Sequence, residues 1–273
     1  MEIDFRDVLD YIRCPLLFYF KKAKNLNLES DLNIHDEYHS AIIKTIQYFY
    51  YKIMDGQVII GTDEIKNRWE RNFQLQNDEA DRHILEDYTQ PANQGNPRLR
   101  KRNKRRKLLY EGWGLLSKFH KSHYEDPGVP VAVDLDHRIK VGNIYVNGNI
   151  ELARVIGEDK NKVEIVSFRT RKKLPTDFEI RHDMSITFQA MLFRDAFGEK
   201  EDILTYYLLD NDRAIQTHRS SMDLQKLDTV ISNVCTSIEQ EIFFPRYTFQ
   251  CYYCHAQEFC AKWTGKQNTG GGN

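Results

Sequence analysis

Three cysteines near the end of the sequence, Cys251, Cys254 and Cys260, form the pattern C-x2-C-x5-C within FQCYYCHAQEFCAKW. Two thiolates that are separated by two residues converge on one soft metal centre from a tight turn, and the third cysteine adds another ligand. A zinc site or a cubane iron-sulfur cluster needs four ligands. The fourth ligand must therefore come from elsewhere, which strongly constrains how the chain folds.

The candidates for this fourth ligand are Cys14, Cys235 and His255. Cys235 lies within VISNVCTSI, a predicted amphipathic helix, where a single cysteine is usually a small buried hydrophobic residue. Cys14 precedes Pro15 at a predicted break between two helices, which is an exposed position already shaped for binding. We therefore expect Cys14 to complete the site. Spacing alone leaves zinc and iron both open, and three unrelated buried cysteines are the alternative.

The composition is that of a soluble globular protein, with 41% hydrophobic and 29% charged residues in a chain of 273. That length suits one large domain, or a core with one insertion. No apolar run approaches the roughly 20 residues that cross a bilayer, and the first residues lack the pattern of a secretory signal. We expect no membrane association and a cytoplasmic or other reducing compartment, where clustered cysteines bind metals rather than form disulfides.

Hydrophobic spacing predicts helices followed by strands, and hence an α/β (α+β) fold. A short helix begins near Phe5 and stops near Cys14, and further helices are expected over 16–23 and 38–53. Three alternating runs at 131–141, 143–156 and 162–170 predict an antiparallel meander. A helix over 184–197 ended by Gly198, a strand at 203–210 and a helix over 224–241 follow.

This pattern divides the chain into five parts. They are N-terminal helices with the first cysteine (1–55), a helical insertion with a basic patch (56–128), a core (129–245), a cysteine segment (246–264) and a flexible Gly-rich tail (265–273).

The run RLRKRNKRRK carries the strongest local charge, although the formal net charge of the whole chain is only −1. It contains no acidic residue, so its like charges repel unless a polyanion relieves them. We expect it to contact nucleic-acid backbone, with an acidic protein surface as the alternative. Tyr110, Trp113 and Phe119 follow and suit base stacking or, for most of them, core packing. The basic residues are Arg98, Arg100, Lys101, Arg102, Lys104, Arg105, Arg106 and Lys107.

The pairing of IRCPLLFYF near the N-terminus with CYYCHAQEFC near the C-terminus resembles the iron-sulfur RecB-like exonucleases. This family includes CRISPR-associated adaptation exonucleases and the nuclease domain of AddB. The resemblance implies a PD-(D/E)XK, restriction-endonuclease-like core with a helical insertion and a C-terminal iron-sulfur clasp. It also implies a 4Fe-4S cluster held by Cys14, Cys251, Cys254 and Cys260.

The family's nuclease motifs are, in order, a helix histidine, an aspartate, an acid two residues before a lysine, and a helix glutamine. The carboxylates bind Mg²⁺ or Mn²⁺, and the lysine helps to activate water. By this resemblance His39 takes the first position and Glu151 the second. Ser167 and Arg169 stand where the acid and lysine belong, and Gln189 takes the last position.

The chemistry of the central pair departs from the motif. Ser167 and Arg169 face one side of a strand, whereas Glu164 faces the other. A hydroxyl lacks the charge of a carboxylate, and a guanidinium stays protonated and repels a cation. Asp134 or Asp136 offers a substitute carboxylate, with a solvated strand position as the alternative.

We therefore favour a DNA-binding or scaffolding subunit with a degenerate catalytic site. It would act on single-stranded DNA, or DNA with single-stranded ends, together with protein partners. The alternatives are an active exonuclease, which alone would require Mg²⁺ or Mn²⁺, and a zinc-stapled protein-interaction module.

Overall fold

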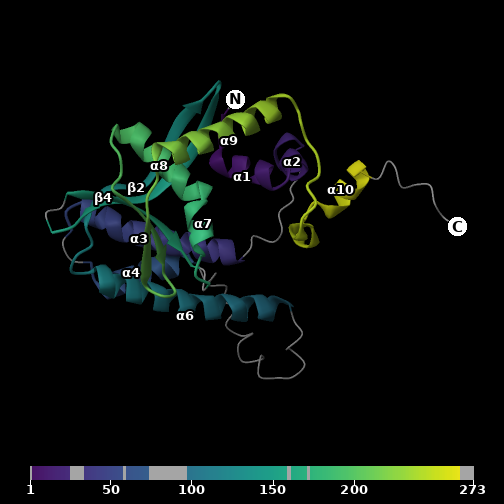
Figure 1. Cartoon of the computed structure of the whole chain (residues 1–273). Helices are drawn as coiled ribbons and strands as arrows, with labels where there is room; N and C mark the ends of the chain where they lie inside the picture. The colour runs from purple at the N-terminus through teal and green to yellow at the C-terminus, as the bar shows by residue number, and fades with distance from the viewer. Residues whose placement is uncertain are drawn as a thin grey trace.

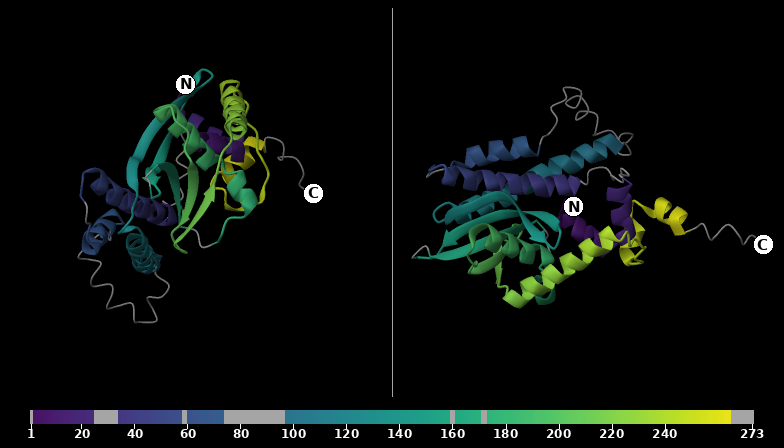
Figure 2. Two further views of the ribbon diagram at one scale, coloured as in Figure 1. Left: turned by 60° about the vertical axis from the view of Figure 1, so that its left-hand side comes forward. Right: turned by 90° about the horizontal axis from the view of Figure 1, so that it is seen from above.

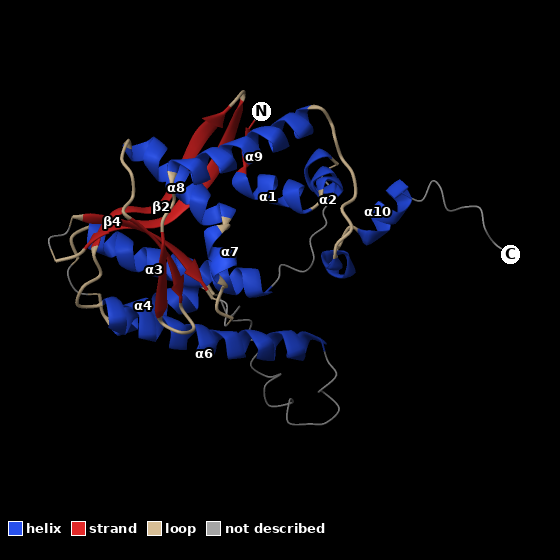
Figure 3. Ribbon diagram, viewed as in Figure 1, coloured by secondary structure: helices blue, strands red, loops and turns tan. Residues whose placement is uncertain are grey.

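A mixed sheet of six strands organises the described part of the computed structural model, which comprises residues 2–24, 34–57, 60–73, 97–158, 161–170 and 173–264. The sheet order is β1-β3-β4-β5-β6, and β2 pairs with β3 outside this path. Figure 3 shows the strands in red between the helices. The strands are β1 (Glu2–Asp4), β2 (Val129–Val141), β3 (Ile144–Ile156), β4 (Lys162–Arg169), β5 (Ile203–Leu208) and β6 (Arg213–Thr217).

Helices cover both faces of the sheet, with α3, α4 and α6 on one side and α1, α8 and α9 on the other (Figures 1 and 2). Within the described ranges, none of these helices is both long enough and apolar enough to span a bilayer. The helices are α1 (Phe5–Arg13), α2 (Pro15–Phe18), the π-helical η1 (Tyr19–Ala23), α3 (Ile34–Met54), α4 (Thr62–Asn72), α6 (Pro97–His123), α7 (Asp177–Arg181), α8 (Met184–Phe197), α9 (Ser221–Glu239), the 3-10 helix η3 (Phe249–Tyr253) and α10 (Gln257–Thr264).

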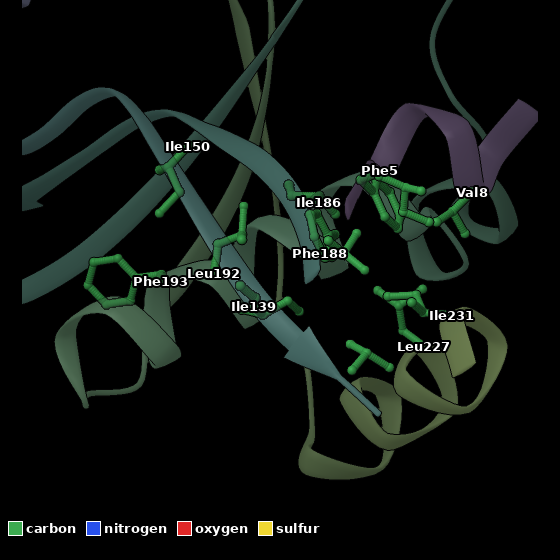
Figure 4. Packing of buried hydrophobic residues seen from close by; sticks show 14 of the residues in the cluster. Phe5, Val8, Ile139, Ile150, Ile186, Phe188, Leu192, Phe193, Leu227 and Ile231 are labelled. Atoms are coloured by element: carbon green, nitrogen blue, oxygen red, sulfur yellow. The ribbon is translucent and has the colours of Figure 1, made fainter. Parts of the chain in front are cut away.

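The core between the sheet and α1, α8 and α9 is formed by apolar side chains at helical and strand spacing (Figure 4). The rings of Phe5 and Phe188 stack with their centroids 4.0 Å apart, which joins the start of α1 to α8. Burial of each such side chain contributes about 1.5–3 kcal/mol. Further members of this core are Val8, Ile139, Ile150, Ile186, Leu192, Phe193, Leu227 and Ile231.

The core on the opposite face is rich in aromatic rings. Trp69 of α4 and Phe73 stack with centroids 4.9 Å apart, and Phe119 of α6 meets Phe168 of β4 edge to face. A Cβ at Gly112 would lie 2.3 Å from the Trp69 ring, so only glycine allows α6 to approach α4 this closely. In the predicted insertion, α6 thus packs on the sheet, and α4 packs against α3 and α6.

Most predicted elements are confirmed. The helix over 184–197 is α8, with Gly198 at φ 70° as its C-cap, and β2, β3 and β4 form the antiparallel meander. The short elements β1, β6 and α7 were not predicted. The predicted flexible tail, 265–273, lies outside the described residues.

Candidate functional site

One edge of β3 is shared by two strands. β2 pairs along one edge of β3. On the other, shared edge, β1 pairs with Tyr145–Asn147 and β4 pairs with Leu152–Ile156. Within the described strands, this leaves 148–151 as a fork between β1 and β4. Glu151 lies where the β3–β4 ladder ends, and its Oε2 accepts a hydrogen bond from the backbone N–H of Phe168 at 2.8 Å. The side-chain carboxylate of Glu151 therefore accepts the hydrogen bond where the backbone pairing of β3 and β4 ends.

The fork brings together Glu151, Ser167, Arg169 and Gln189, which are four of the five residues assigned to motif positions from the sequence. Ser167, fully buried on β4, donates to Glu151 Oε1 at 3.3 Å. Its Oγ accepts from Arg169 Nη1 at 2.7 Å and from Gln189 Nε2 at 3.2 Å. The serine hydroxyl thus links all three other side chains, and its hydrogen-bonding capacity is used.

The charge of Arg169 lies beside the carboxylate. Its Nη1 is 3.7 Å from Glu151 Oε1, and Nη1 also donates to the carbonyl of Phe168 at 2.9 Å. Burial raises the pKa of Glu151 above its ordinary value, while the neighbouring guanidinium and the hydrogen bonds it accepts oppose that rise. The centre therefore contains an internal cation in contact with its acid.

His39 approaches from α3. Its Nδ1 lies 3.2 Å from Thr170 Oγ1, immediately after β4. Burial lowers the pKa of His39, and the charge of Arg169 lowers it further, so the imidazole is favoured in its neutral form. Thr170 was not predicted as a site residue, because a threonine after a strand gives no distinguishing signal.

Gln189 reaches the centre because α8 lies very close to β3. A Cβ at Gly148 would lie 2.4 Å from the Phe188 ring, so glycine permits this approach. Gln189 is only 6% exposed, and its Oε1 has no hydrogen-bond partner among the described residues. The residue also borders an open cavity of about 740 Å³, whose lining includes Asp136 and Asn149.

The two aspartates of β2 lie next to this centre. Asn149 Nδ2 donates to Oδ1 of both Asp134 and Asp136 at 2.9 Å, and Gln47 Nε2 donates to Asp134 at 3.1 Å. Asp134 has a φ of 50°, a conformation that is uncommon for aspartate within a strand. Nevertheless, no three His, Cys, Asp or Glu side chains of the described ranges form a group that would hold a single metal ion.

A second site joins the two ends of the described chain. Its cavity has a volume of about 420 Å³, and α2 lies beside η3 and α10 in Figures 1 and 2. Burial raises the pKa of the Cys260 thiol, and the charges of the other three cysteines raise it further, so the four sulfurs influence one another. The cysteines lining the cavity are Cys14, Cys251, Cys254 and Cys260.

The other two candidate ligands lie differently. Cys235 is buried in the core on α9, where burial raises its pKa to about 11, and His255 is exposed. Neither lines the cavity of the four cysteines. The backbone N–H of Leu16 donates to the carbonyl of Phe244 at 3.1 Å, which fixes the segment after Cys14 against the chain leading to the other three.

The basic run forms the first part of α6. Lys104, Arg106 and Lys107 are exposed. Arg105 pairs with Glu37 of α3 at 2.6 Å, and Lys107 Nζ lies 3.8 Å from Glu111 Oε1 one turn along the helix, which corrects the expectation that the whole run lacks acidic partners. Tyr110 is exposed, whereas Trp113 and Phe119 pack in the core. The side chains of Arg98, Arg100, Lys101 and Arg102 lie outside the described part.

Comparison with known proteins identifies one family. The model for the PD-(D/E)XK nuclease superfamily matches residues 7–261. No curated protein matches the chain. A solved structure described as "Crystal structure of SSO0001" is similar at 16% sequence identity and a TM-score of 0.33, covering 71% of this chain and 79% of that one.

Proposed function

Because the chain belongs to the PD-(D/E)XK nuclease superfamily, we propose that it is a DNA-binding protein whose nuclease centre has lost its catalytic chemistry. The observation that carries this proposal is the contact between Arg169 and Glu151, at 3.7 Å, in the fork of the sheet. The protein would act as a subunit or scaffold in DNA processing, together with protein partners.

The family name itself states the motif, in which an acid stands two residues before a lysine. Here Ser167 and Arg169 take those positions. A hard divalent cation is held by several oxygen ligands, usually carboxylates. Ser167 supplies no negative charge, and the guanidinium both neutralises Glu151 and repels a cation. Arg169 thus stands in for the positive charge that a metal would bring.

The test of this proposal is a paired restoration of the motif. Wild-type protein with Mn²⁺ is expected to degrade DNA no faster than a blank. Ser167→Asp combined with Arg169→Lys should create a second carboxylate beside Glu151 and remove the guanidinium. We expect this double variant to bind Mn²⁺, and metal at about 100 times its Kd would stabilise the protein by about 2.7 kcal/mol. Thermal unfolding with and without Mn²⁺ measures this gain.

Single restorations provide the controls. Ser167→Asp alone keeps the guanidinium, and Arg169→Lys alone keeps a centre with one carboxylate, so neither should gain metal-dependent stability. The alternative function is an active exonuclease that uses Asp134 or Asp136, and it predicts that the wild-type protein degrades DNA. Robust Mn²⁺-dependent degradation by wild-type protein, abolished by Glu151→Ala, would establish that alternative and refute the proposal.

The cysteine cavity completes the proposed function with a 4Fe-4S cluster. Four thiols fit the ligand set of such a cluster. A single zinc ion needs all four sulfurs about 2.3 Å from one point, whereas a cubane spreads its thiolates over different iron atoms. We prefer the cluster to the zinc module because the cysteine pattern resembles that of the iron-sulfur nucleases, and because the cavity that the four thiols line has a volume of about 420 Å³. The cluster would serve as a structural link between chain segments.

DNA binding is expected to depend on the exposed cations at the beginning of α6. Replacing Lys104, Arg106 and Lys107 together with glutamine should weaken binding to all sequences alike. If each contacts one phosphate, the slope of log affinity against log salt should become shallower by about 2 on single strands. Fluorescence anisotropy across a salt series measures this slope.

The same helix offers a matched control in Lys118 and Lys121, which are exposed near its other end. Their replacement with glutamine should change the slope much less. Equal effects of the two sets would show only a general influence of net charge, and would remove α6 as the binding surface.

A further inference from the structure

We propose that Tyr247, Phe249 and Tyr252 form an aromatic platform on which bases of single-stranded nucleic acid stack. The proposal rests on the DNA-binding function proposed above, and it adds a site that reads the bases of the strand rather than its phosphates.

The first observation is the unusual exposure of these rings. Tyr247 is 77% exposed, Phe249 76% and Tyr252 85%, and none makes a ring contact with another described aromatic side chain. The neighbouring Phe259 and Trp263 behave differently, since both pack against Phe20 of η1. Tyr247 and Tyr252 also line the cysteine cavity, so the platform lies at its rim. Single exposed aromatic residues are common, whereas three within six residues form a concentrated aromatic surface of the kind that binds a partner.

The backbone beneath the rings is held in place. Thr248 caps η3, and its Oγ1 accepts from the N–H of Gln250 at 3.3 Å. The N–H of Cys254 donates to the carbonyl of Cys251 at 3.2 Å, which closes the turn. Rings on a fixed backbone stack with a smaller loss of entropy than rings on a mobile loop.

The charge around the platform is complementary to a polyanion. No Asp or Glu occurs from 242 to 257. Two exposed arginines flank the rings. Arg246 Nη1 donates to the carbonyl of Ile12 at 2.6 Å, and Arg13 Nε donates to Gln250 Oε1 at 2.8 Å. Each guanidinium has five N–H donors, so both retain donors for phosphate.

These features favour single-stranded nucleic acid over a protein partner. Aromatic rings interleaved with cations suit a strand whose bases stack and whose phosphates lie between them, whatever the sequence. In addition, the beginning of α6, which carries exposed Lys104 and Arg106, lies toward the same end of the molecule as η3 and α10 (Figures 1 and 2).

The test compares two labelled probes of equal length, an oligothymidylate and an abasic strand with the same phosphates. Wild-type protein should bind the oligothymidylate more tightly, because only this probe can stack. Replacing Tyr247, Phe249 and Tyr252 together with alanine should weaken oligothymidylate binding at least about 10-fold and leave abasic binding unchanged.

Two controls separate stacking from damage to the fold. Phe178 on α7 is 71% exposed, and Phe178→Ala should leave both affinities unchanged. Conservative replacement by Phe249→Tyr and Tyr252→Phe retains the rings and should retain the preference for the oligothymidylate. Loss of the preference in these conservative variants would overturn the platform, as would its loss in Phe178→Ala.

The outcomes also separate this proposal from the one on which it rests. Wild-type protein that binds neither probe would refute DNA binding itself. Wild-type protein that binds both probes equally, or a triple-alanine variant with unchanged preference, would overturn the platform while DNA binding stands. A wild-type dimer that the triple variant dissociates, with unchanged affinity for DNA, would assign the rings to a second copy of the chain and overturn the proposal.

Discussion

Replacing Arg154 with methionine is expected to lower the free energy of unfolding by about 3–5 kcal/mol, because it leaves a buried carboxylate without its partner. Arg154 Nε donates to Glu164 Oε2 at 2.7 Å, and only 2% of Glu164 is exposed. Thr205 Oγ1 also donates to Glu164, at 2.5 Å, but a neutral hydroxyl cannot balance its charge. Urea denaturation of the variant and wild type measures the difference.

Two further variants test the cause of this loss. Combining Arg154→Met with Glu164→Leu removes both charges, so the double variant should be more stable than Arg154→Met alone. Arg138 is an exposed arginine of the neighbouring strand β2, 3.9 Å from Glu2, and Arg138→Met should change stability by no more than about 0.5 kcal/mol. Equal losses for Arg154→Met and Arg138→Met would contradict the assignment of a buried charge pair.

This network also positions the candidate site. Arg154 and Glu164 face each other across β3 and β4, and Arg154 Nη1 donates to Tyr50 Oη of α3 at 2.6 Å. Those three elements carry Glu151, Ser167 and His39. The buried pair therefore links the three elements that carry these motif positions.

Strand periodicity was enough to place several of these residues. Alternation predicted that Ser167 and Arg169 share a side and that Glu164 faces the other side. Both predictions are confirmed, since Arg169 bonds to Ser167 while Glu164 meets Arg154 on the side of α3. A period of two residues suffices for this because it acts within one strand and needs no tertiary information.

The contacts that determine the charge at the candidate site and on the basic run could not be predicted from the sequence, because they form between distant residues. The pairing of Arg105 with Glu37 joins residues 68 positions apart, and a pattern read along one helix contains no sign of it. The contact of Arg169 with Glu151 likewise depends on how far two strands separate. The three residues of β1 are too few to show a period, and the positive φ of Asp134 has no local sequence signal.

The cysteines represent an intermediate case. Local reasoning placed Cys235 in a core helix and Cys14 at a helix break, and both placements are confirmed. The spacing of cysteines along the sequence does not identify which distant thiol lies near Cys251, Cys254 and Cys260. In the structure, Cys14 lines the same cavity as those three cysteines, whereas the bound metal stays a prediction.

Replacing Cys14 with serine is expected to prevent binding of the proposed iron-sulfur cluster and to release the cysteine segment from the rest of the fold. Protein purified without oxygen should show the broad visible absorbance of a cluster, with iron and sulfide in a 1:1 ratio, and Cys14→Ser should lose it. The apolar contact that would remain is small, because within the described residues its buried members are only Leu16, Leu17, Phe20 and Ala256. Stoichiometric zinc in the wild type would replace iron as the metal but keep the four ligands.

How far the cysteine segment separates from the fold in Cys14→Ser depends on the interactions, other than the metal, that hold it there. A structural centre that joins distant parts of a chain exists only in the folded state, so its binding free energy stabilises the folded state. Without it, hydrogen bonds such as that from Tyr11 Oη to the carbonyl of Ile242, at 2.6 Å, must retain the segment, and each contributes only about 1 kcal/mol. Protease should therefore cleave Cys14→Ser between 240 and 264 long before it cleaves the sheet.

Cys235→Ala is the matched control, since that thiol is buried on α9 away from the cavity and its loss should leave metal content and the cleavage pattern as in wild type. If Cys14→Ser keeps its metal and its resistance to protease, Cys14 is not a ligand, and the link between the two ends of the chain must be purely apolar.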